Sequence, residues 1–281
     1  MTDRIDIGID GGGSGCRVVV STQGRAARAT GGPANVVTDP AAAEAAIRAA
    51  LLGALGQMSL SLDNMQSARV VAGLAGCRLP GTADAFAMRL PFLANVVDDS
   101  VTALEGAFDG DQGTLVNLGT GSFFIRRDAR GITHHGGWGV QIGDEGSAAW
   151  LGREALRQLM WIEDGRAPHW SHDPLRQQIW RALDAHPVEF AANATPEAFG
   201  QLAPLVVASD GDWAHSLRSK VLREVVIAFE DIGHPDGAPW VMTGGLGAAL
   251  VERTPDALPP GSRPAAGTAL DGALAMARAL P

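Results

Sequence analysis

The fold is decided by a stretch near the N-terminus, Ile5-Asp-Ile-Gly-Ile-Asp-Gly-Gly-Gly-Ser-Gly-Cys-Arg-Val-Val-Val-Ser21. The segments Ile5–Asp10 and Cys16–Ser21 are apolar and predict two β-strands, and the small residues Gly11–Gly15 between them predict a tight turn. Because glycine has no Cβ, an anion can approach its backbone N–H group closely. The stretch therefore predicts a hairpin whose turn can receive phosphate oxygens, although Asp-Gly pairs are also common in ordinary hairpin turns.

The same pattern returns at the head of the second half, after a polar break at Gly110–Gly113. An apolar strand is predicted at Thr114–Leu118, a small-residue turn at Gly119–Ser122 and a returning strand at Phe123–Arg127. A pattern that recurs in this way indicates two related domains. Two opposed turns of this kind can hold the β- and γ-phosphates of a nucleotide from both sides.

Helices alternate with short strands along the rest of the chain, which indicates an α/β architecture. We expect one domain over residues 1–111 and a second over 112–281, with the final helix packing back on the first. The tryptophan-rich stretch 161–213 predicts a helical subdomain with an aromatic core. Helices are predicted at Pro40–Leu62, Ala83–Leu90, Val101–Phe108, Ser147–Trp161, Ala214–Asp231, Ala248–Glu252 and Ala269–Leu280, and further strands at Ala68–Leu74, Asn95–Val97 and Trp240–Met242.

The composition excludes several classes of protein. Residues are 46% hydrophobic and 19% charged, which suits a folded core rather than a disordered chain. The net charge of −9 and the lack of a basic run argue against nucleic-acid binding. Lys220 is the one lysine in the sequence, so a P-loop, which requires Gly-Lys-Ser/Thr, cannot be written. Bound phosphates must therefore be held by backbone N–H groups, hydroxyls, arginine and a metal ion.

Cysteine usage and apolar runs bear on the compartment. Cys16 and Cys77 form no Cys-x-x-Cys pair, so the sequence indicates neither a zinc site nor a redox motif. The N-terminus lacks the apolar core of a signal peptide, and no apolar run reaches transmembrane length. We therefore expect a cytoplasmic protein that does not enter a membrane.

Asp10 ends the first strand, directly before the first turn. Its carboxylate would repel phosphate, so a divalent cation is expected between them, held by Asp10 through water. The candidate phosphate-binding residues are Asp10, Gly11, Gly12, Gly13 and Ser14 in the first turn and Gly119, Thr120, Gly121 and Ser122 in the second.

A third glycine segment, Thr243-Gly244-Gly245, follows a predicted strand and precedes a helix. A junction of this kind suits an adenosine or a phosphate at a helix N-terminus. Close packing of a strand on a helix explains the same glycines, and on this segment alone it is the better explanation.

Asp98 and Asp99 lie where a predicted strand ends and a helix begins. Aspartate is a good helix cap, which is one explanation. The other is a catalytic base, because phosphoryl transfer to an alcohol uses a carboxylate within hydrogen-bond reach of the attacking hydroxyl. The spacing alone leaves both explanations open.

Trp138, Asp144 and Glu145 lie in the glycine-rich segment Gly136–Gly146. An aromatic ring, carboxylates and glycine backbone suit a sugar-binding pocket. The two acidic side chains would also stabilise the N-terminus of the following helix through its dipole, so a purely structural role stays open. The adjacent histidines His134 and His135 are expected to be solvated in a polar loop.

Taken in order, these segments resemble the BadF/BadG/BcrA/BcrD-type ATPase family and, within it, the N-acetylglucosamine kinases and the bacterial glucosamine kinases. The resemblance implies two actin-like (ribonuclease-H-like, ASKHA) domains of mixed sheet direction, with ATP and Mg²⁺ in the cleft between them. It covers nearly the whole chain and rests on Gly8–Arg17, Gly73–Gly76, Asp99, Gly119–Ser122, Gly136–Gly139, Gly143–Ser147 and Asp271–Leu274.

The resemblance also implies roles for single residues. Asp99 matches the catalytic base, and Thr243-Gly244-Gly245 matches the nucleotide side. Ser14 stands where threonine is common in the family, which keeps the hydroxyl. The residues expected to contact the sugar are Asn35, Gly73, Gly137, Trp138 and Asp144.

The implied activity is ATP-dependent transfer of the γ-phosphoryl group to the 6-hydroxyl of N-acetylglucosamine, with glucosamine as the alternative acceptor. Two other classes stay open: an ATPase that activates an acyl-CoA dehydratase or reductase through a shared iron–sulfur cluster, and a nucleotide- and sugar-binding sensor without activity. Cys16 and Cys77 do not look placed to hold such a cluster. A small amino sugar is the expected partner, and a homodimer is an open alternative to a monomer.

Overall fold

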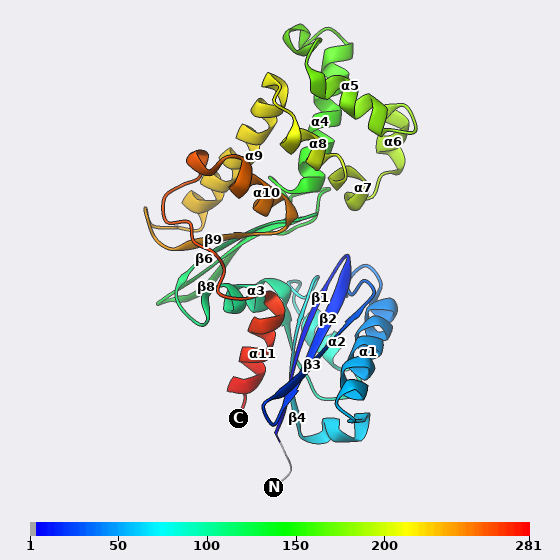
Figure 1. Cartoon of the computed structure of the whole chain (residues 1–281), viewed down its shortest axis with the longest axis vertical. Coiled ribbons are helices and arrows are strands. Elements are labelled where there is room, and N and C mark those ends of the chain that lie inside the picture. Colours follow the sequence, from blue (N-terminus) through cyan, green and yellow to red (C-terminus); the bar gives the residue numbers. More distant parts are fainter. Residues whose placement is uncertain (1–3) are drawn as a thin grey trace. The chain divides into compact units, whose positions relative to one another are not determined.

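Figure 1 shows the computed structural model of the chain, which describes residues 4–281. The chain divides into two compact units. The first comprises the chain up to Gln112 together with Ala265–Pro281, and the second comprises Gly113–Pro264. No helix within the described residues is long and apolar enough to cross a membrane.

The first unit is built on a five-stranded sheet with the strand order β3-β2-β1-β4-β5. The β1–β2 and β2–β3 pairs are antiparallel, whereas the β1–β4 and β4–β5 pairs are parallel, so the sheet is mixed as expected. Parallel strands end at one edge of a sheet, which sets where loops between them gather. The strands are β1 (Ile5–Gly12), β2 (Gly15–Thr22), β3 (Arg25–Gly31), β4 (Ala68–Leu74) and β5 (Asn95–Asp98).

Helices cover both faces of this sheet. Ile7 of β1 packs with Ile47 and Leu51 of α1 in the main core of the unit, on one face. On the other face, Val71 of β4 packs with Ala273 of α11. The helical segments are α1 (Pro40–Gln57), η1 (Leu62–Ser67), α2 (Thr82–Ala87), α3 (Asp99–Phe108) and α11 (Ala269–Ala279).

Glycines let the C-terminal helix α11 lie directly on α3 and β1 (Figure 1). A Cβ added to Gly8 of β1 would lie 2.6 Å from the backbone nitrogen of Leu274. A Cβ on Gly106 of α3 would overlap the carbonyl of Thr268, directly before α11. The backbone-to-backbone approach of these elements therefore requires glycine at both positions.

The second unit carries a four-stranded mixed sheet with the order β8-β7-β6-β9, in which only the β6–β9 pair is parallel. Its strands are β6 (Gly113–Leu118), β7 (Ser122–Asp128), β8 (Gly131–Gly136) and β9 (Trp240–Thr243). Its helical segments are α4 (Ala148–Glu163), η2 (Pro168–Trp170), α5 (Pro174–Ala182), α6 (Pro187–Asn193), α7 (Pro196–Gly200), α8 (Ala203–Ala208), α9 (Asp212–Asp231), α10 (Gly245–Arg253) and η3 (Pro255–Ala257).

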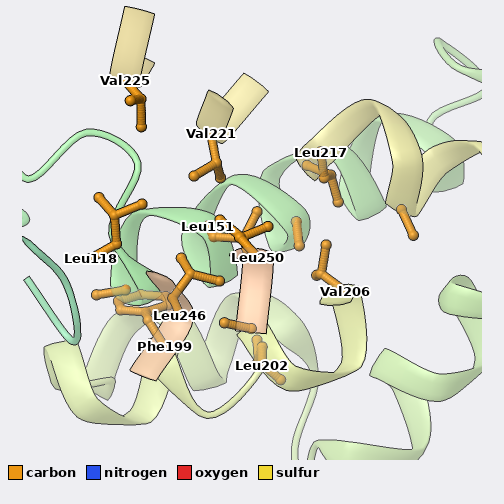
Figure 2. Close-up of a cluster of buried hydrophobic side chains, with 14 of the residues drawn as sticks. Leu118, Leu151, Phe199, Leu202, Val206, Leu217, Val221, Val225, Leu246 and Leu250 are labelled. Atoms are coloured by element: carbon orange, nitrogen blue, oxygen red, sulfur yellow. The ribbon is translucent and has the colours of Figure 1, made fainter. Parts of the chain in front are cut away.

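One continuous core holds the helices of the second unit together. Figure 2 shows side chains of α4, α7, α8, α9 and α10 converging there, among them Leu151, Val221 and Leu250. Trp213 at the start of α9 is fully buried, and its indole nitrogen donates a 2.8 Å hydrogen bond to Oε1 of Gln158. The stretch 161–213 is helical as predicted, with α5–α8, but these helices share the core of the unit. Trp213 is buried there, whereas Trp161, Trp170 and Trp180 are half-buried.

Three elements differ from the sequence expectations. Strand β3 was not expected because its residues, Arg-Ala-Ala-Arg-Ala-Thr-Gly, are mostly small or charged and partly exposed at the sheet edge. Helix α1 ends at Gln57, before the expected Leu62, because Ser59 adopts a left-handed φ of 58° and turns the chain. His134 and His135 lie in β8 rather than in a loop, as partners of β7.

Candidate functional site

The first group of candidate residues lies at the carboxyl edge of the parallel strands of the first unit. Asp10 of β1 pairs in register with Gly73 of β4, and Leu74 pairs with Asp98 of β5. Asp99 follows directly as the first residue of α3. The topology therefore brings Asp10 to the same edge as the adjacent pair Asp98 and Asp99, although Asp10 is far from them in sequence.

Helix α3 can lie close to the sheet because residue 73 of β4 is a glycine. A Cβ on Gly73 would overlap the hydroxyl of Thr102, so the first turn of α3 lies directly on Gly73. The Thr102 hydroxyl in turn donates a 3.0 Å hydrogen bond to the carbonyl of Asp99. Gly73 therefore sets the distance of Asp99 from the sheet, while Asp98 caps the helix by accepting from the Ser100 N–H at 3.2 Å. The expected contact of Gly73 with the sugar stays a prediction.

The carboxyl of Asp99 has a perturbed acidity. Burial and the negative charges of Asp98 and Asp10 raise the pKa of Asp99 to about 7. Each of these factors disfavours the ionised form, because the charge is desolvated and repelled by like charges. A carboxylate with a pKa near neutrality is well matched to proton abstraction at the pH of a cell.

The first glycine turn is a two-residue turn at the tip of the β1–β2 hairpin. Gly12 pairs with Gly15, and Gly13 and Ser14 between them are exposed. The carbonyls behind the tip are tied to neighbouring loops, since Gly12 accepts from Ala34 N at 2.9 Å. The turn is therefore shorter than the predicted Gly11–Gly15. Its exposed tip follows a strand end that is hydrogen-bonded to a neighbouring loop.

Asp10 and Arg17 lie opposite each other on β1 and β2, and Nη1 of Arg17 donates to Oδ2 of Asp10 at 2.9 Å. Burial raises the pKa of Asp10, and the Arg17 guanidinium opposes this rise. Within residues 4–281, no cluster of three His, Cys, Asp or Glu side chains could hold a metal ion. The single carboxylate of Asp10 fits Mg²⁺, which commonly uses one or two carboxylates together with water and substrate phosphates.

The second turn, Gly119–Ser122, is tied to the start of α4. Gly119 N donates to Gly121 O at 2.9 Å, and the Gly119 carbonyl accepts from Ala148 N at 2.9 Å. The buried Ser122 hydroxyl donates to the carbonyl of Glu145 at 2.8 Å, whereas Thr120 is exposed at the tip. The Ser122 side chain is thus used internally, and Thr120 presents the hydroxyl of this turn to solvent.

Asp144 connects this turn to the glycine loop that carries Trp138. Its buried carboxylate accepts from Gly139 N at 2.9 Å and from the backbone N–H of Ser122. A Cβ on Gly121 would lie 2.6 Å from Oδ2 of Asp144. Burial raises the pKa of Asp144, and the two backbone hydrogen bonds oppose the rise. The carboxylate therefore fixes two loops.

The other residues expected to contact the sugar lie in loops of both units. In the second unit, Trp138 is 52% exposed and Gly137 has a left-handed φ of 77°. In the first unit, Oδ1 of Asn35 accepts from Val37 N at 3.0 Å and from Thr38 N at 3.1 Å. The Asn35 oxygen thus shapes its own loop, and the expected contact of Asn35 with the sugar stays a prediction.

The segment Thr243–Gly245 forms the junction between β9 and α10. Thr243 donates through Oγ1 to Oδ1 of Asn117 at 3.1 Å. Gly244 has a φ of 85°, and a Cβ there would overlap the carbonyl of Leu118, so close packing requires this glycine. Within the described residues, no side chain caps the N-terminus of α10. Close packing therefore accounts for Gly244, and the expected contact of this segment with the nucleotide stays a prediction.

A cavity of about 780 Å³ opens beside this junction, entirely within the second unit. It is lined at one end by the turn residues Gly119 and Thr120 with Gly245, and at the other by Glu252 and Arg253 of α10. Its volume is in the range of sites for cofactors and small ligands. The wall formed by α7 and α8 was not foreseen, because the small apolar residues of that stretch carry no motif.

A model of the BadF/BadG/BcrA/BcrD ATPase family matches residues 7–231, which include both glycine turns and Asp99. The chain belongs to this family. Among curated proteins, the glucosamine kinase GspK of Vibrio cholerae is 30% identical over 208 residues, 71% of this chain and 69% of that protein. An N-acetylmuramic acid/N-acetylglucosamine kinase of Clostridium acetobutylicum is 29% identical over 167 residues, which is 55% of its length.

Solved structures agree with the family and its fold. A candidate N-acetylglucosamine kinase from Chromobacterium violaceum is 31% identical, with a TM-score of 0.86 over 98% of this chain and 99% of that one. A ROK family glucokinase from Streptomyces griseus, in complex with glucose and AMPPNP, is 14% identical with a TM-score of 0.55 over 98% of this chain and all of that one. The second likeness concerns the fold alone. Together the two structures confirm the α/β class predicted from the order of the elements and the actin-like fold implied by the family resemblance.

Proposed function

We propose that this chain is an ATP-dependent amino-sugar kinase that transfers the γ-phosphoryl group to the 6-hydroxyl of N-acetylglucosamine. The observation that carries the proposal is Asp99, a carboxyl with a pKa of about 7 at the carboxyl edge of a sheet whose hairpin ends in a glycine turn. The names of the relatives support the acceptor class. Glucosamine, the acceptor named for the Vibrio relative, is the alternative.

In this proposal Asp99 accepts the proton of the sugar 6-hydroxyl as that oxygen attacks the γ-phosphorus of ATP. The oxygen–phosphorus bond to ADP breaks, and the proton stays on the Asp99 carboxyl until it is released to water. The turns at Gly13–Ser14 and Gly119–Thr120 contact the phosphate oxygens through backbone N–H groups and hydroxyls. Mg²⁺, held by Asp10 through water, would neutralise phosphate charge.

The cavity of the second unit is the proposed nucleotide site. Its lining includes the turn Gly119–Thr120 and the uncapped N-terminus of α10 at Gly245, and both suit phosphate groups. We propose Asn35, Gly137, Trp138 and Asp144 as the sugar side, where Asp144 acts chiefly by holding the loop of Trp138 in place.

The activator class is disfavoured by both cysteines. Cys16 and Cys77 are buried, and burial raises the pKa of the Cys77 thiol to about 12. Cluster ligands are thiolates, and a shared cluster requires them at a surface. An iron-free, colourless protein would agree with the kinase proposal, whereas an iron–sulfur absorption band would favour the activator class.

A coupled ADP-release assay tests the proposal. Glucosamine, N-acetylglucosamine, N-acetylmannosamine and glucose are compared as acceptors at saturating Mg·ATP, with a sugar-free control. We expect ADP release that depends on an amino sugar and is fastest with N-acetylglucosamine. Equal ADP release with and without sugar would overturn the proposal. Separately, light scattering of the same sample would distinguish a monomer from a homodimer.

A further inference from the structure

The cavity beside α10 offers very few groups that could read a nucleotide base. Its long wall is formed by small or apolar residues of α4, α7, α8 and α10. Among the described lining residues, three have polar side chains: Thr120 at the phosphate end, and Glu252 and Arg253 at the far end. The wall residues are Ala148, Gly200, Ala203, Pro204, Val207, Ala208, Leu246 and Ala249.

Three backbone carbonyls at the end of α8 already accept hydrogen bonds within the protein. The last carbonyls of a helix lack intrahelical partners and are natural acceptors for an amino group of a ligand. At the end of α8, however, Nη1 of the buried Arg218 donates to Val206 O at 2.7 Å and to Ser209 O at 2.7 Å. The same nitrogen lies 3.4 Å from Val207 O. Arg218 therefore takes up part of the acceptor capacity of these carbonyls, which leaves less for a ligand.

The two charged side chains at the far end are poor discriminators. Glu252 and Arg253 are exposed, and Arg253 is already paired with Asp210 of the α8–α9 connection. A base group that mismatches an exposed side chain can bond to water instead, so the mismatch costs little. A guanidinium can also stack on any base, because every base has a π-face.

We infer that this pocket binds the base by shape and accepts purine nucleoside triphosphates in general, with ITP and GTP replacing ATP as phosphoryl donors. The inference rests on the proposed function, since it takes the cavity as the nucleotide site. A pocket with a buried hydrogen-bond group rejects a mismatched analogue by about 10⁴–10⁵-fold, whereas an apolar pocket discriminates by only about 10–200-fold. The wall of this cavity belongs to the second kind.

The test compares kcat/KM for ATP, ITP and GTP at a saturating concentration of the best amino sugar. We expect ITP and GTP to remain within about 200-fold of ATP. A loss of about 10⁴-fold or more for ITP would show a buried group that reads the 6-position and would overturn the inference. Such a loss leaves the kinase proposal intact, whereas a lack of sugar-dependent turnover with ATP itself would overturn both.

A pair of neighbouring substitutions on α10 tests whether the cavity is where the base binds. Ala249 lines the cavity and is half-buried, whereas Ala248 is exposed and does not line it. We expect Ala249→Leu to raise KM for ATP, ITP and GTP in parallel by tenfold or more, with the KM for the sugar unchanged. Ala248→Leu is the matched control and should leave all four values unchanged.

Binding of a fluorescent ATP analogue and thermal unfolding of both variants complete the test. If Ala249→Leu unfolds at the same temperature as Ala248→Leu and still binds every nucleotide normally, the base does not occupy this cavity and the inference is wrong. A change for ATP alone would also contradict it, because a site that binds by shape cannot single out one purine.

Discussion

Gly73 of β4 lies directly beneath the Thr102 hydroxyl of α3, so closely that a Cβ on Gly73 would overlap it. Thr102 also holds the carbonyl of Asp99, which begins the same helix. The missing side chain of Gly73 therefore determines how near the proposed base lies to Asp10, the register partner of Gly73.

Replacing Gly73 with alanine should push α3 away from the sheet. We expect Gly73→Ala to lower kcat by tenfold or more and to lower the unfolding temperature, because the added methyl group would overlap the packed side chain of Thr102. Gly56→Ala on α1 is the matched control, since a Cβ there meets no atom within 4 Å. That variant should keep full activity and gain roughly 0.5–1 kcal/mol of stability. Equal activity of the two variants would contradict the positioning role.

Asp99→Asn should remove the proposed base while preserving its volume. We expect kcat to fall by about 10²–10⁴-fold, the range of general-base catalysis, with little change in KM for ATP. In the wild type the base works only when ionised, so kcat/KM should rise with pH and reach half its plateau near pH 7, the pKa of Asp99. A flat profile between pH 6 and 8 would contradict the assignment.

The raised pKa of Asp99 should make stability fall as pH rises, whereas it makes activity rise. Because the pKa of Asp99 is raised in the folded state, folding favours the protonated form, and its contribution to stability is lost as pH rises from about 4 through 7. The asparagine variant has no such charge to bury. We therefore expect Asp99→Asn to unfold at a higher temperature than the wild type at pH 8, with a smaller difference at pH 5, in scanning calorimetry.

Asp144→Asn should loosen both loops that the carboxylate holds. The two backbone N–H groups, of Gly139 and Ser122, would share a single amide oxygen, and the amide nitrogen would face donors. We expect a loss of about 1–3 kcal/mol in stability, as for a buried donor left unpaired, and a raised KM for the sugar. Glu145→Gln, at the exposed neighbouring position, should change neither, as urea unfolding and initial rates would show.

Arg17→Gln should weaken ATP binding at the first glycine turn at low pH. Without the guanidinium at 2.9 Å, the pKa of Asp10 rises further, so less of the carboxylate is ionised below neutrality. We expect KM for ATP to rise more at pH 6 than at pH 8, by about tenfold or roughly 1.4 kcal/mol at the lower pH. Arg25→Gln, exposed at the start of β3, controls for the lost charge. An equal rise at both pH values would show that Arg17 acts without Asp10.

The sequence was sufficient for features that depend on neighbouring residues. The hairpin around Gly13–Ser14, the Asp98 cap of α3 and the Ser147 cap of α4 follow from local rules for turns and helix ends. The α/β class followed from the order of the elements.

Features that depend on distant residues could not be predicted. The contact between Gly73 and Thr102 and the hydrogen bonds of Asp144 join segments that only the fold brings together. The wall of the cavity at Ala203–Ala208 has no motif, because its chemistry lies in the absence of polar side chains. Edge strand β3 was missed since an exposed edge does not need apolar residues.

The most direct measurement is the position of the phosphoryl group on the product. The wild-type protein is incubated with Mg·ATP and N-acetylglucosamine, and in parallel with glucosamine, and the product is analysed by proton–phosphorus correlation NMR. The account predicts a phosphomonoester coupled to the two protons on carbon 6 of the sugar. Inorganic phosphate alone, or phosphorus coupled to a proton at another ring position, would contradict it.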